Sequence, residues 1–188
     1  MTLPYQTFTK QRFSLYLQPE GKSLDILTTA MSTLADEYMG PKFVPHVTLL
    51  PERWATLSEI VSLTQEIAKT ITSLIPITLT DISMGSTHFK CVFFTILETP
   101  ELLLLARKAR EVFGVTPEEV PFSAHVSMLY DGFDSTKTVL SIKQKETATQ
   151  LLRNQITLPF SYDCSGIAIH TSTPVVSEWQ QVAFVPFG

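Results

Sequence analysis

The sequence FVPHVTLL at residues 43–50 returns in related form as FSAHVSMLY at residues 122–130. Each copy places a hydroxyl residue two positions after a histidine: Thr48 follows His46, and Ser127 follows His125. Side chains in a β-strand alternate between its two faces, so residues two apart project to the same side. We therefore predict two strands whose histidine and hydroxyl side chains converge on one cleft.

The opposite face of each copy is apolar. It is formed by Phe43, Pro45, Val47 and Leu49 in the first copy and by Phe122, Ala124, Val126 and Met128 in the second. Such a face can anchor a strand on a helix and defines its register, because a slip of one residue would bury the histidine. Strict alternation also places Tyr130 on this apolar face, so the pattern leaves open whether Tyr130 is a site residue or a core aromatic.

The segments around the two copies alternate between strand and helix patterns. Strands are predicted within 13–19, 43–50, 77–84, 89–97, 122–130, 156–170 and 179–187, and helices over 23–40, 56–71, 99–113 and 136–153. This order predicts an α+β fold in which helices cover the outer faces of antiparallel sheets. The repeated histidine strand favours two pseudo-symmetric sheets around a central cleft. We expect residues 1–188 to form one domain of two lobes.

The composition is that of a globular protein with an apolar core. The 188 residues are 44% hydrophobic and 17% charged, and the formal net charge is −4. A long nucleic-acid ligand normally needs a clustered basic surface, so we expect none. Cys91 and Cys164 have no zinc-ligand spacing and are predicted to be free thiols in a reducing compartment. Without a signal-peptide pattern or a membrane-spanning apolar run, we expect a cytoplasmic or nuclear protein that does not contact membranes.

The paired motifs resemble those of the two-histidine (2H) phosphoesterase superfamily, which is defined by two H-x-[T/S]-x sequences. Within it, the chain is most similar to the plant and fungal cyclic phosphodiesterases. The similarity rests on the spacing of His46 and His125, on Pro45 before the first histidine, on the β-rich segment FKCVFFTIL and on Tyr130 after the second motif. In layout the resemblance covers most of the chain.

The resemblance implies a bilobal antiparallel fold with both motifs lining the cleft, and hydrolysis of cyclic phosphates without a metal or other cofactor. It implies two substrates: ADP-ribose 1″,2″-cyclic phosphate, which arises in tRNA splicing, and nucleoside 2′,3′-cyclic phosphates, which are opened to the 2′-phosphate. It also implies that Tyr130 lies at the active site. Apart from this small-molecule substrate we expect no long nucleic-acid ligand and no membrane contact, and we expect a monomer.

The residues themselves suit this chemistry. Opening a cyclic phosphodiester needs a base that activates water and an acid that protonates the departing sugar oxygen. Histidine can serve as either near neutral pH, and we assign the base to His125 and the acid to His46. Thr48 and Ser127 can donate hydrogen bonds to the nonbridging phosphate oxygens as charge builds. Neither motif holds an Asp or Glu, so a metal site would lack ligands and we predict none.

Two other functions fit the same motifs. An RNA-end-processing or 2′-5′ RNA ligase-like enzyme of the superfamily would use the same residues, although the acidic net charge counts against it. A nucleotide-binding module without turnover would not need both an acid and a base. Trp179 opens the last predicted strand, where its ring can stack on a nucleobase as a substrate contact or pack in the core.

Overall fold

The computed structural model describes residues 9–116, 122–131 and 139–188. Its strands are β1 (Gln11–Leu17), β2 (Val47–Ala55), β3 (Ile75–Thr87), β4 (Lys90–Ile96), β5 (His125–Leu129), β6 (Phe160–Cys164), β7 (Gly166–Thr171) and β8 (Gln181–Pro186). Its helices are α1 (Gly21–Tyr38), α2 (Leu57–Ala68), α3 (Pro100–Val112) and α4 (Ile142–Gln155), and a short 3₁₀ helix, η1, spans Val176–Glu178. The helix predicted over 136–153 begins at Ile142 instead, and residues 136–138 lie outside the described part of the chain.

The eight described strands form one antiparallel sheet in the order β6-β3-β4-β5-β2-β1-β7-β8. The sheet has two halves, because β5 and β2 meet through a single residue pair, Val47 with Val126. We call β6-β3-β4-β5 the β5 half and β2-β1-β7-β8 the β2 half. The predicted α+β class is confirmed, with one correction: the two expected sheets are joined into one by this backbone contact.

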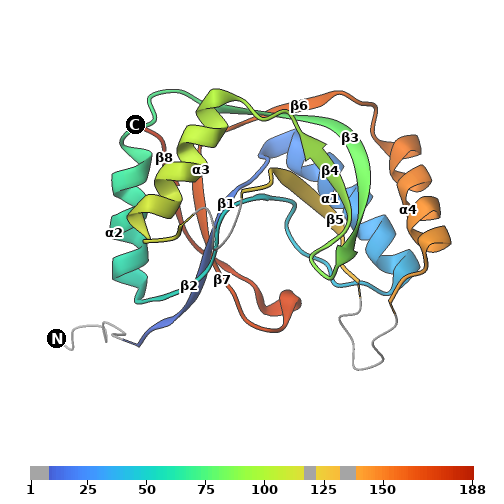
Figure 1. The fold of residues 1–188 in the computed structure, drawn as a ribbon, viewed down its shortest axis with the longest axis horizontal. Coiled ribbons are helices and arrows are strands. Elements are labelled where there is room, and N and C mark those ends of the chain that lie inside the picture. The colour runs from blue at the N-terminus through green and yellow to red at the C-terminus, as the bar shows by residue number, and fades with distance from the viewer. Residues whose placement is uncertain (1–8, 117–121, 132–138) are drawn as a thin grey trace.

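Each half of the sheet is covered by two helices (Figure 1). Helices α2 and α3 pack against each other and on strands of the β2 half, while α1 and α4 pack against each other and on strands of the β5 half. The chain crosses repeatedly between the halves. For example, α1 follows β1 of the β2 half but covers the β5 half.

Capping residues determine where three of the helices begin. The Thr56 hydroxyl accepts a hydrogen bond from the Glu59 amide at 3.2 Å, while the Glu59 carboxylate accepts one from the Thr56 amide at 2.7 Å. Ser141 and Gln144 form the same reciprocal capping box at α4, and Thr99 caps α3. Each cap satisfies amide groups that have no partner within the first turn of a helix.

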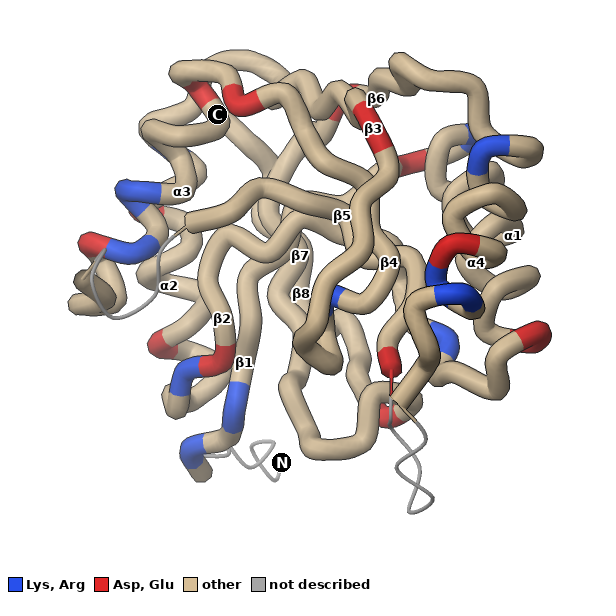
Figure 2. Tube along the Cα trace, turned by 45° about the vertical axis from the view of Figure 1, so that its right-hand side comes forward, with Lys and Arg blue, Asp and Glu red and all other residues tan. Residues whose placement is uncertain are grey.

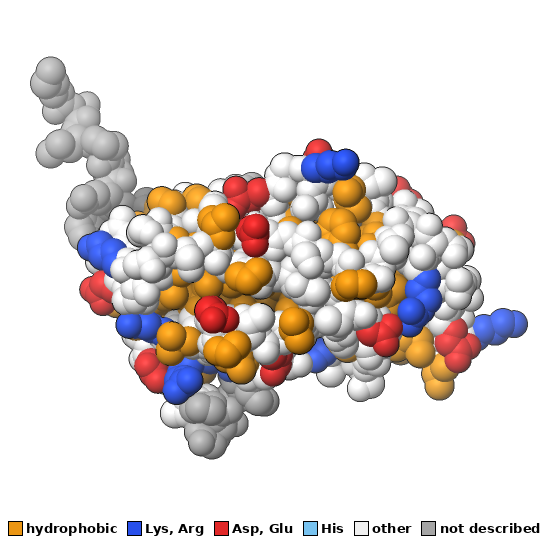
Figure 3. Space-filling model, turned by 90° about the horizontal axis from the view of Figure 1, so that it is seen from above, with side chains coloured by type: hydrophobic (Ala, Val, Ile, Leu, Met, Phe, Trp, Pro, Cys, Tyr) orange, Lys and Arg blue, Asp and Glu red, His pale blue; other side chains and the backbone are white. Residues whose placement is uncertain are grey.

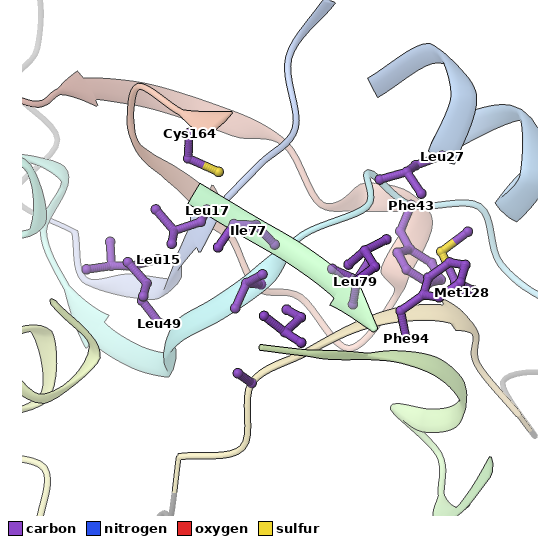
Figure 4. Close-up of a cluster of buried hydrophobic side chains, with 14 of the residues drawn as sticks. Leu15, Leu17, Leu27, Phe43, Leu49, Ile77, Leu79, Phe94, Met128 and Cys164 are labelled. Carbon is purple, nitrogen blue, oxygen red and sulfur yellow. The ribbon is translucent and has the colours of Figure 1, made fainter. Parts of the chain in front are cut away.

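The core lies between the sheet and the helices (Figure 4). Helix α1 contributes Leu27, Met31 and Leu34 at helical spacing, and none of the three is more than 1% exposed. Leu49 of β2 and Met128 of β5, from the apolar faces of the histidine strands, are also fully buried. Burying a side chain of this size stabilises the fold by about 1.5–3 kcal/mol. The apolar faces therefore anchor both histidine strands.

A corner at Ser165 divides the predicted strand segment 156–170 into β6 and β7. Ser165 donates to the Glu20 carboxylate through its amide at 3.2 Å and through its hydroxyl at 2.6 Å. At the next residue, Gly166, a Cβ atom would collide with the carbonyl oxygen of Val185. Because β6 pairs with β3 and β7 pairs with β1, the corner carries the chain from the β5 half to the β2 half.

Charged residues lie mainly on the helices and near the ends of strands (Figure 2). On the face shown in Figure 3, acidic and basic side chains are interspersed among hydrophobic ones, and no continuous basic surface is visible there. Among the described residues, no helix combines the length and the apolar character needed to cross a membrane.

Candidate active site

The two histidine motifs meet at the junction of the two halves of the sheet. The joining pair, Val47 and Val126, consists of the residues that directly follow the two histidines. In an antiparallel pairing, this register places His46 opposite Ser127 and His125 opposite Thr48. The two imidazoles and the two hydroxyls therefore project from neighbouring strands to the same side of the sheet.

The backbone holds both imidazoles in the same way. Nδ1 of His46 lies 2.7 Å from the carbonyl oxygen of Val44, and Nδ1 of His125 lies 2.7 Å from that of Ser123. A carbonyl oxygen can only accept, so each Nδ1 carries the hydrogen. In the neutral ring the proton-accepting atom is then Nε2. Both motifs thus offer the same atom for acid–base chemistry.

The surroundings favour the neutral form of both imidazoles. Burial lowers the pKa of His46 to about 3, with smaller contributions from charge repulsion by His170 and His125. Burial also lowers the pKa of His125, assisted by the positive charge of Lys90. His46 is only 6% exposed, whereas His125 is less deeply buried. An anionic ligand placed between the rings would favour a proton on one of them, because opposite charge stabilises the charged form.

Tyr16 of β1 supports the ring of His46. The two rings stack with centroids 3.7 Å apart and planes at 22°. The Tyr16 phenol is hydrogen-bonded to Ser14 and Ser172, whose hydroxyl oxygens are 2.6 Å apart. Burial raises the pKa of Tyr16 to about 12, so its phenol stays protonated near neutral pH. Tyr16 therefore holds the plane of the His46 ring as a neutral partner.

Tyr130 reaches the cleft because β5 contains a β-bulge. Two adjacent residues of β4 pair with Ser127 and Leu129, so Met128 is an extra residue on β5. An extra residue shifts the alternation of faces by one position. Tyr130 therefore lies on the side of Ser127, to which its phenol is hydrogen-bonded, and its ring stacks on Phe43 at 3.9 Å. The location of Tyr130 is thus at the cleft, and its role in the reaction stays a prediction.

The motif side chains line one cavity of about 400 Å³ at the junction. The residues predicted from the sequence all line it: His46, Thr48, His125, Ser127, Tyr130 and Trp179. A cavity of this volume is typical of sites for small organic ligands. The structure thus brings the predicted residues together, while their roles in binding and catalysis stay predictions.

Trp179 follows η1 and forms part of the cavity wall. Its indole N–H donates to the carbonyl oxygen of Thr173 at 2.8 Å, which fixes the orientation of the ring. The ring centroid lies 6.4 Å from that of Tyr16 and 6.5 Å from that of His46. Trp179 therefore packs on the supporting tyrosine and also borders the cavity.

Ser127 connects its motif to the turn between β3 and β4. Its hydroxyl donates to the carbonyl oxygen of Phe89 at 2.7 Å. A hydroxyl hydrogen can rotate about its C–O bond, so Ser127 can redirect this donor toward a phosphate oxygen. The same contact holds the β3–β4 turn against the cavity.

Two cationic residues also line the cavity. The Lys90 ammonium donates to the Ser123 hydroxyl at 2.7 Å, next to His125. Arg110 is 7% exposed, and its guanidinium lies 5.1 Å from the ring centroid of Phe122. Positive charge in a wall of low dielectric constant favours an anionic ligand.

The model of the cyclic phosphodiesterase-like protein family matches residues 12–187, a range that includes both histidine motifs. The chain belongs to this family. The prediction of a 2H phosphoesterase of the cyclic phosphodiesterase type is thereby confirmed. The cyclic phosphodiesterase of Arabidopsis thaliana is 27% identical over 121 residues; the match covers 64% of this chain and 66% of that enzyme, just under two thirds of its length.

Solved structures share the fold over nearly the whole chain. Escherichia coli LigT complexed with 3′-AMP has a TM-score of 0.63 at 14% identity, and the match covers 95% of this chain and 98% of that one. TT0787 of Thermus thermophilus has a TM-score of 0.63 at 16% identity, covering 94% and 98%. Usb1 of Kluyveromyces marxianus has a TM-score of 0.55 at 11% identity, covering 95% and 99%. At these identities the likeness shows the fold alone.

This member of the cyclic phosphodiesterase-like family has further cavity residues that sequence reasoning missed. They include Ser14, Tyr16, Phe89, Lys90, Arg110 and Ser172. The positions of Ser14 and Tyr16 could have been predicted to share one face, because the two residues lie two positions apart in a strand. The histidine and the hydroxyl of each motif have the same spacing. The sequence around Phe89 did not indicate a place in the cavity, since only the pairing of β3 and β4 brings that turn there.

The buried neutral His46 makes the folded chain sensitive to acid. An unfolded histidine titrates near 6.5, but the pKa of His46 in the fold is about 3, so between these values only the unfolded state binds the proton. The free energy of unfolding should therefore fall as the pH drops below 6.5, by up to about 1.4 kcal/mol per pH unit from this group. His170, whose pKa burial lowers to about 4, acts in the same direction.

Urea unfolding of the wild type and of His46→Asn at about pH 7 and about pH 5.5 measures this effect. The wild type should lose more stability on acidification than His46→Asn, because asparagine does not titrate. Equal free energies of unfolding of the wild type at the two pH values would contradict the burial of a neutral imidazole.

Proposed function

We propose that this family member hydrolyses small cyclic phosphodiesters through His46 and His125, without a metal in the chemical step. The substrates are nucleoside 2′,3′-cyclic phosphates, opened to the 2′-phosphate, or ADP-ribose 1″,2″-cyclic phosphate. The observation that carries the proposal is the matched geometry of the imidazoles. Each ring donates its Nδ1 hydrogen to the carbonyl oxygen of the residue two positions earlier, which leaves its Nε2 atom for proton transfer. Both rings line one cavity.

The reaction needs one proton transfer at each histidine. The base accepts a proton from water through Nε2, and the water oxygen attacks phosphorus. The bond from phosphorus to the departing sugar oxygen breaks, and the acid gives its Nε2 proton to that oxygen. The product is a phosphate monoester. The base is left protonated and the acid neutral, and exchange of one proton with solvent restores the pair.

Burial favours His46 as the base and His125 as the acid, the reverse of the assignment made from the sequence. When the pair shares one proton, that proton rests on the group with the higher pKa. The pKa of His46 is about 3, whereas that of His125 is lowered less. We therefore place the transferable proton on His125.

Thr48 and Ser127 are the proposed donors to the nonbridging phosphate oxygens. Their place on the same two strands as the imidazoles, and in the lining of the same cavity, supports this role. Donors held close to the reacting group by a strand backbone stabilise developing charge with little reorganisation. Lys90 and Arg110 add positive charge to the same cavity.

The metal-free step is supported by the donor set of the site. Neither motif contributes a carboxylate, and within the described ranges no group of three or more His, Cys, Asp or Glu residues is arranged to hold a metal ion. Two neutral imidazoles with hydroxyl neighbours are a poor ligand set for Mg²⁺ or Ca²⁺, which take oxygen ligands and carboxylates above all.

The test is a substrate panel in buffer containing EDTA. It comprises adenosine 2′,3′-cyclic phosphate, ADP-ribose 1″,2″-cyclic phosphate and an RNA oligonucleotide that ends in a 2′,3′-cyclic phosphate. We expect turnover of a small substrate, an adenosine 2′-phosphate product from the first, and the same rate with and without EDTA. The double variant His46→Ala/His125→Ala is the negative control.

Other outcomes of this panel contradict the proposal in distinct ways. Turnover of the RNA alone would indicate an RNA-end-processing enzyme. Binding of a small substrate without hydrolysis would indicate a nucleotide-binding module. Loss of activity in EDTA that Mg²⁺ or Zn²⁺ restores would show that a metal takes part.

A further inference from the structure

A buried ion pair connects helix α4 to the end of β5. The ammonium group of Lys145 lies 3.5 Å from the carboxylate of Asp131, and the two residues are 8% and 7% exposed. Lysine and aspartate are rarely buried this deeply unless they are paired, because taking a charge out of water is costly. Neither residue lines the cavity of the candidate active site. Any effect of the pair on that site therefore passes through the residues that the pair holds.

The same lysine also holds the hairpin of β3 and β4. Its ammonium group donates a hydrogen bond to the carbonyl oxygen of Gly85 at 2.9 Å. Gly85 lies at a β-bulge of β3, where a Cβ atom would collide with the carbonyl oxygen of Lys90. Helix α4, which carries Lys145, packs on both strands of this hairpin (Figure 1). One cation thus joins α4, the hairpin and the end of β5.

Asp131 holds the turn of this hairpin through its backbone. Its amide donates to the carbonyl oxygen of His88 at 3.2 Å, and its carbonyl oxygen accepts a hydrogen bond from Nδ1 of His88. Its carboxylate also accepts the amide of Leu140, just before α4, with distances of 3.0 and 3.1 Å to the two oxygens. The position of the turn therefore depends on Asp131, which Lys145 and Leu140 hold in place.

The turn in its own right contacts the second histidine motif. Phe89 follows His88, and its carbonyl oxygen accepts the hydrogen bond of the Ser127 hydroxyl at 2.7 Å. Tyr130, which directly precedes Asp131, is hydrogen-bonded to the same hydroxyl. Each of these two partners of Ser127 is thus the sequence neighbour of a residue in the buried network. A displacement of about 1 Å in a group that positions the reaction can lower its rate about 100-fold.

We propose that Lys145 and Asp131 are positioning residues that hold the Ser127 hydroxyl in place for its hydrogen bond to the phosphate. Neither residue touches the substrate. Their ion pair fixes the β3–β4 turn against the end of β5, and the turn and Tyr130 fix the hydroxyl. The pair takes this role within the proposed function, on which the inference rests, and it extends the site to a helix that contributes no residue to the cavity lining.

A double-mutant cycle tests whether Lys145 acts through Ser127. Lys145→Met removes the ammonium group and should lower kcat on adenosine 2′,3′-cyclic phosphate about 10- to 100-fold. In the Ser127→Ala background, the same change should lower kcat by less than about twofold, because the hydroxyl that it positions is absent. In the Thr48→Val background, it should lower kcat by its full factor. An equal factor in all three backgrounds would show a general structural effect and would overturn the inference.

Two further lysine variants control for charge and for helix α4. Lys145→Arg keeps the positive charge and should retain more of the wild-type kcat than Lys145→Met. Lys143→Met removes an exposed lysine of the same helix and should leave kcat unchanged. A loss of kcat in Lys143→Met equal to that in Lys145→Met would contradict the role of the buried pair.

The variant Lys145→Met/Asp131→Asn separates stability from positioning. It removes both charges and keeps a carboxamide oxygen for the amide of Leu140, so no buried charge is left unpaired. Its midpoint of urea unfolding should therefore lie above that of Lys145→Met. Its kcat should stay low, because the link from α4 to Gly85 and to the turn is still missing. Recovery of the wild-type kcat together with the stability would overturn the inference.

Amide hydrogen exchange, followed by NMR, tests the link without turnover. The Asp131 amide, which donates to the His88 carbonyl oxygen, should exchange at least about tenfold faster in Lys145→Met, because a charged partner of its own side chain is lost. The Thr171 amide, which donates to Gln180 in the β2 half, should keep its wild-type rate. An unchanged rate for Asp131 would overturn the inference. If the wild type hydrolyses no cyclic phosphodiester, the proposed function fails, and this experiment still decides whether the pair holds the turn.

Discussion

Alanine at His46 or at His125 is expected to lower kcat roughly 10²- to 10⁴-fold, because either change removes a proton transfer from the transition state. KM should change less, because the proposal assigns both imidazoles to proton transfer rather than to binding of the substrate. The kcat of the double variant should be only slightly lower than that of the less active single variant, because the proposed acid and base act in the same step. Steady-state kinetics with adenosine 2′,3′-cyclic phosphate measures all three.

His170→Gln is the matched control for these variants. His170 is also a buried histidine, at 4% exposed, but its Nε2 lies 2.7 Å from the Gln18 amide nitrogen and it does not line the main cavity. This variant should keep a kcat close to that of the wild type, because charge repulsion from His170 affects the pKa of His46 less than burial does. A His46→Ala protein with a wild-type circular dichroism spectrum and nearly full hydrolysis would contradict the two-histidine mechanism.

An activated diester separates the two roles. A p-nitrophenolate leaving group departs without protonation, so the variant that lacks the acid should recover more of its rate on such a substrate than the variant that lacks the base. We expect this recovery for His125→Ala. Recovery for His46→Ala instead would restore the assignment made from the sequence.

The pH profile of wild-type kcat/KM belongs to the same prediction. It should be bell-shaped with both apparent pKa values below 6.5, because the pKa values of both imidazoles are lowered in the ligand-free cavity. Above the upper value both rings are neutral and no acid remains; below the lower value both are protonated and no base remains. An optimum above pH 6.5 would contradict this interpretation.

Removing the hydroxyl of Thr48 or of Ser127 is expected to lower kcat by about 10²- to 10³-fold, the usual effect of losing one fixed donor to transition-state charge. Thr48→Val keeps the shape of the side chain. Ser127→Ala also removes the bond to the Phe89 carbonyl, so its loss should be the larger. The measurement is kcat and KM for each variant on the same cyclic nucleotide.

Two further variants isolate the role of the hydroxyls. Ser127→Thr keeps the donor and should recover part of the lost rate. Thr80→Val removes a hydroxyl that pairs with that of Thr95 at 3.0 Å on β3, outside the cavity, and should leave kcat unchanged. If Thr48→Val raises KM and leaves kcat unchanged, the hydroxyl binds the ground state, contrary to the proposal.

The secondary structure could be predicted where it depends on neighbours in the sequence. The alternation around His46 and His125 extends over a few residues, as do the caps at Thr56 and Thr99. Such local signals also indicated four of the cavity residues, because spacing by two is enough to place a histidine and a hydroxyl on one face.

The remaining features depend on residues that are far apart in the sequence. Met128 is an extra residue only relative to β4, so HVSMLY alone gives no sign of the bulge that turns Tyr130 into the cleft. The corner at Ser165 depends on Glu20 and on the closeness of Val185 to Gly166. The joining of two expected sheets into one likewise depends on a single long-range contact between the motifs.

The crossings of the chain between the halves of the sheet bear on how the two motifs are kept together. In the sequence, the motifs resemble a tandem duplication whose two copies could be separated by a cut between them. In the fold, α1 comes from between two strands of the β2 half yet covers the β5 half, and the Ser165 corner returns the chain to the β2 half. A cut between the motifs would therefore leave each piece with elements that belong to the other half. The position of each motif therefore depends on elements from both sides of the cut.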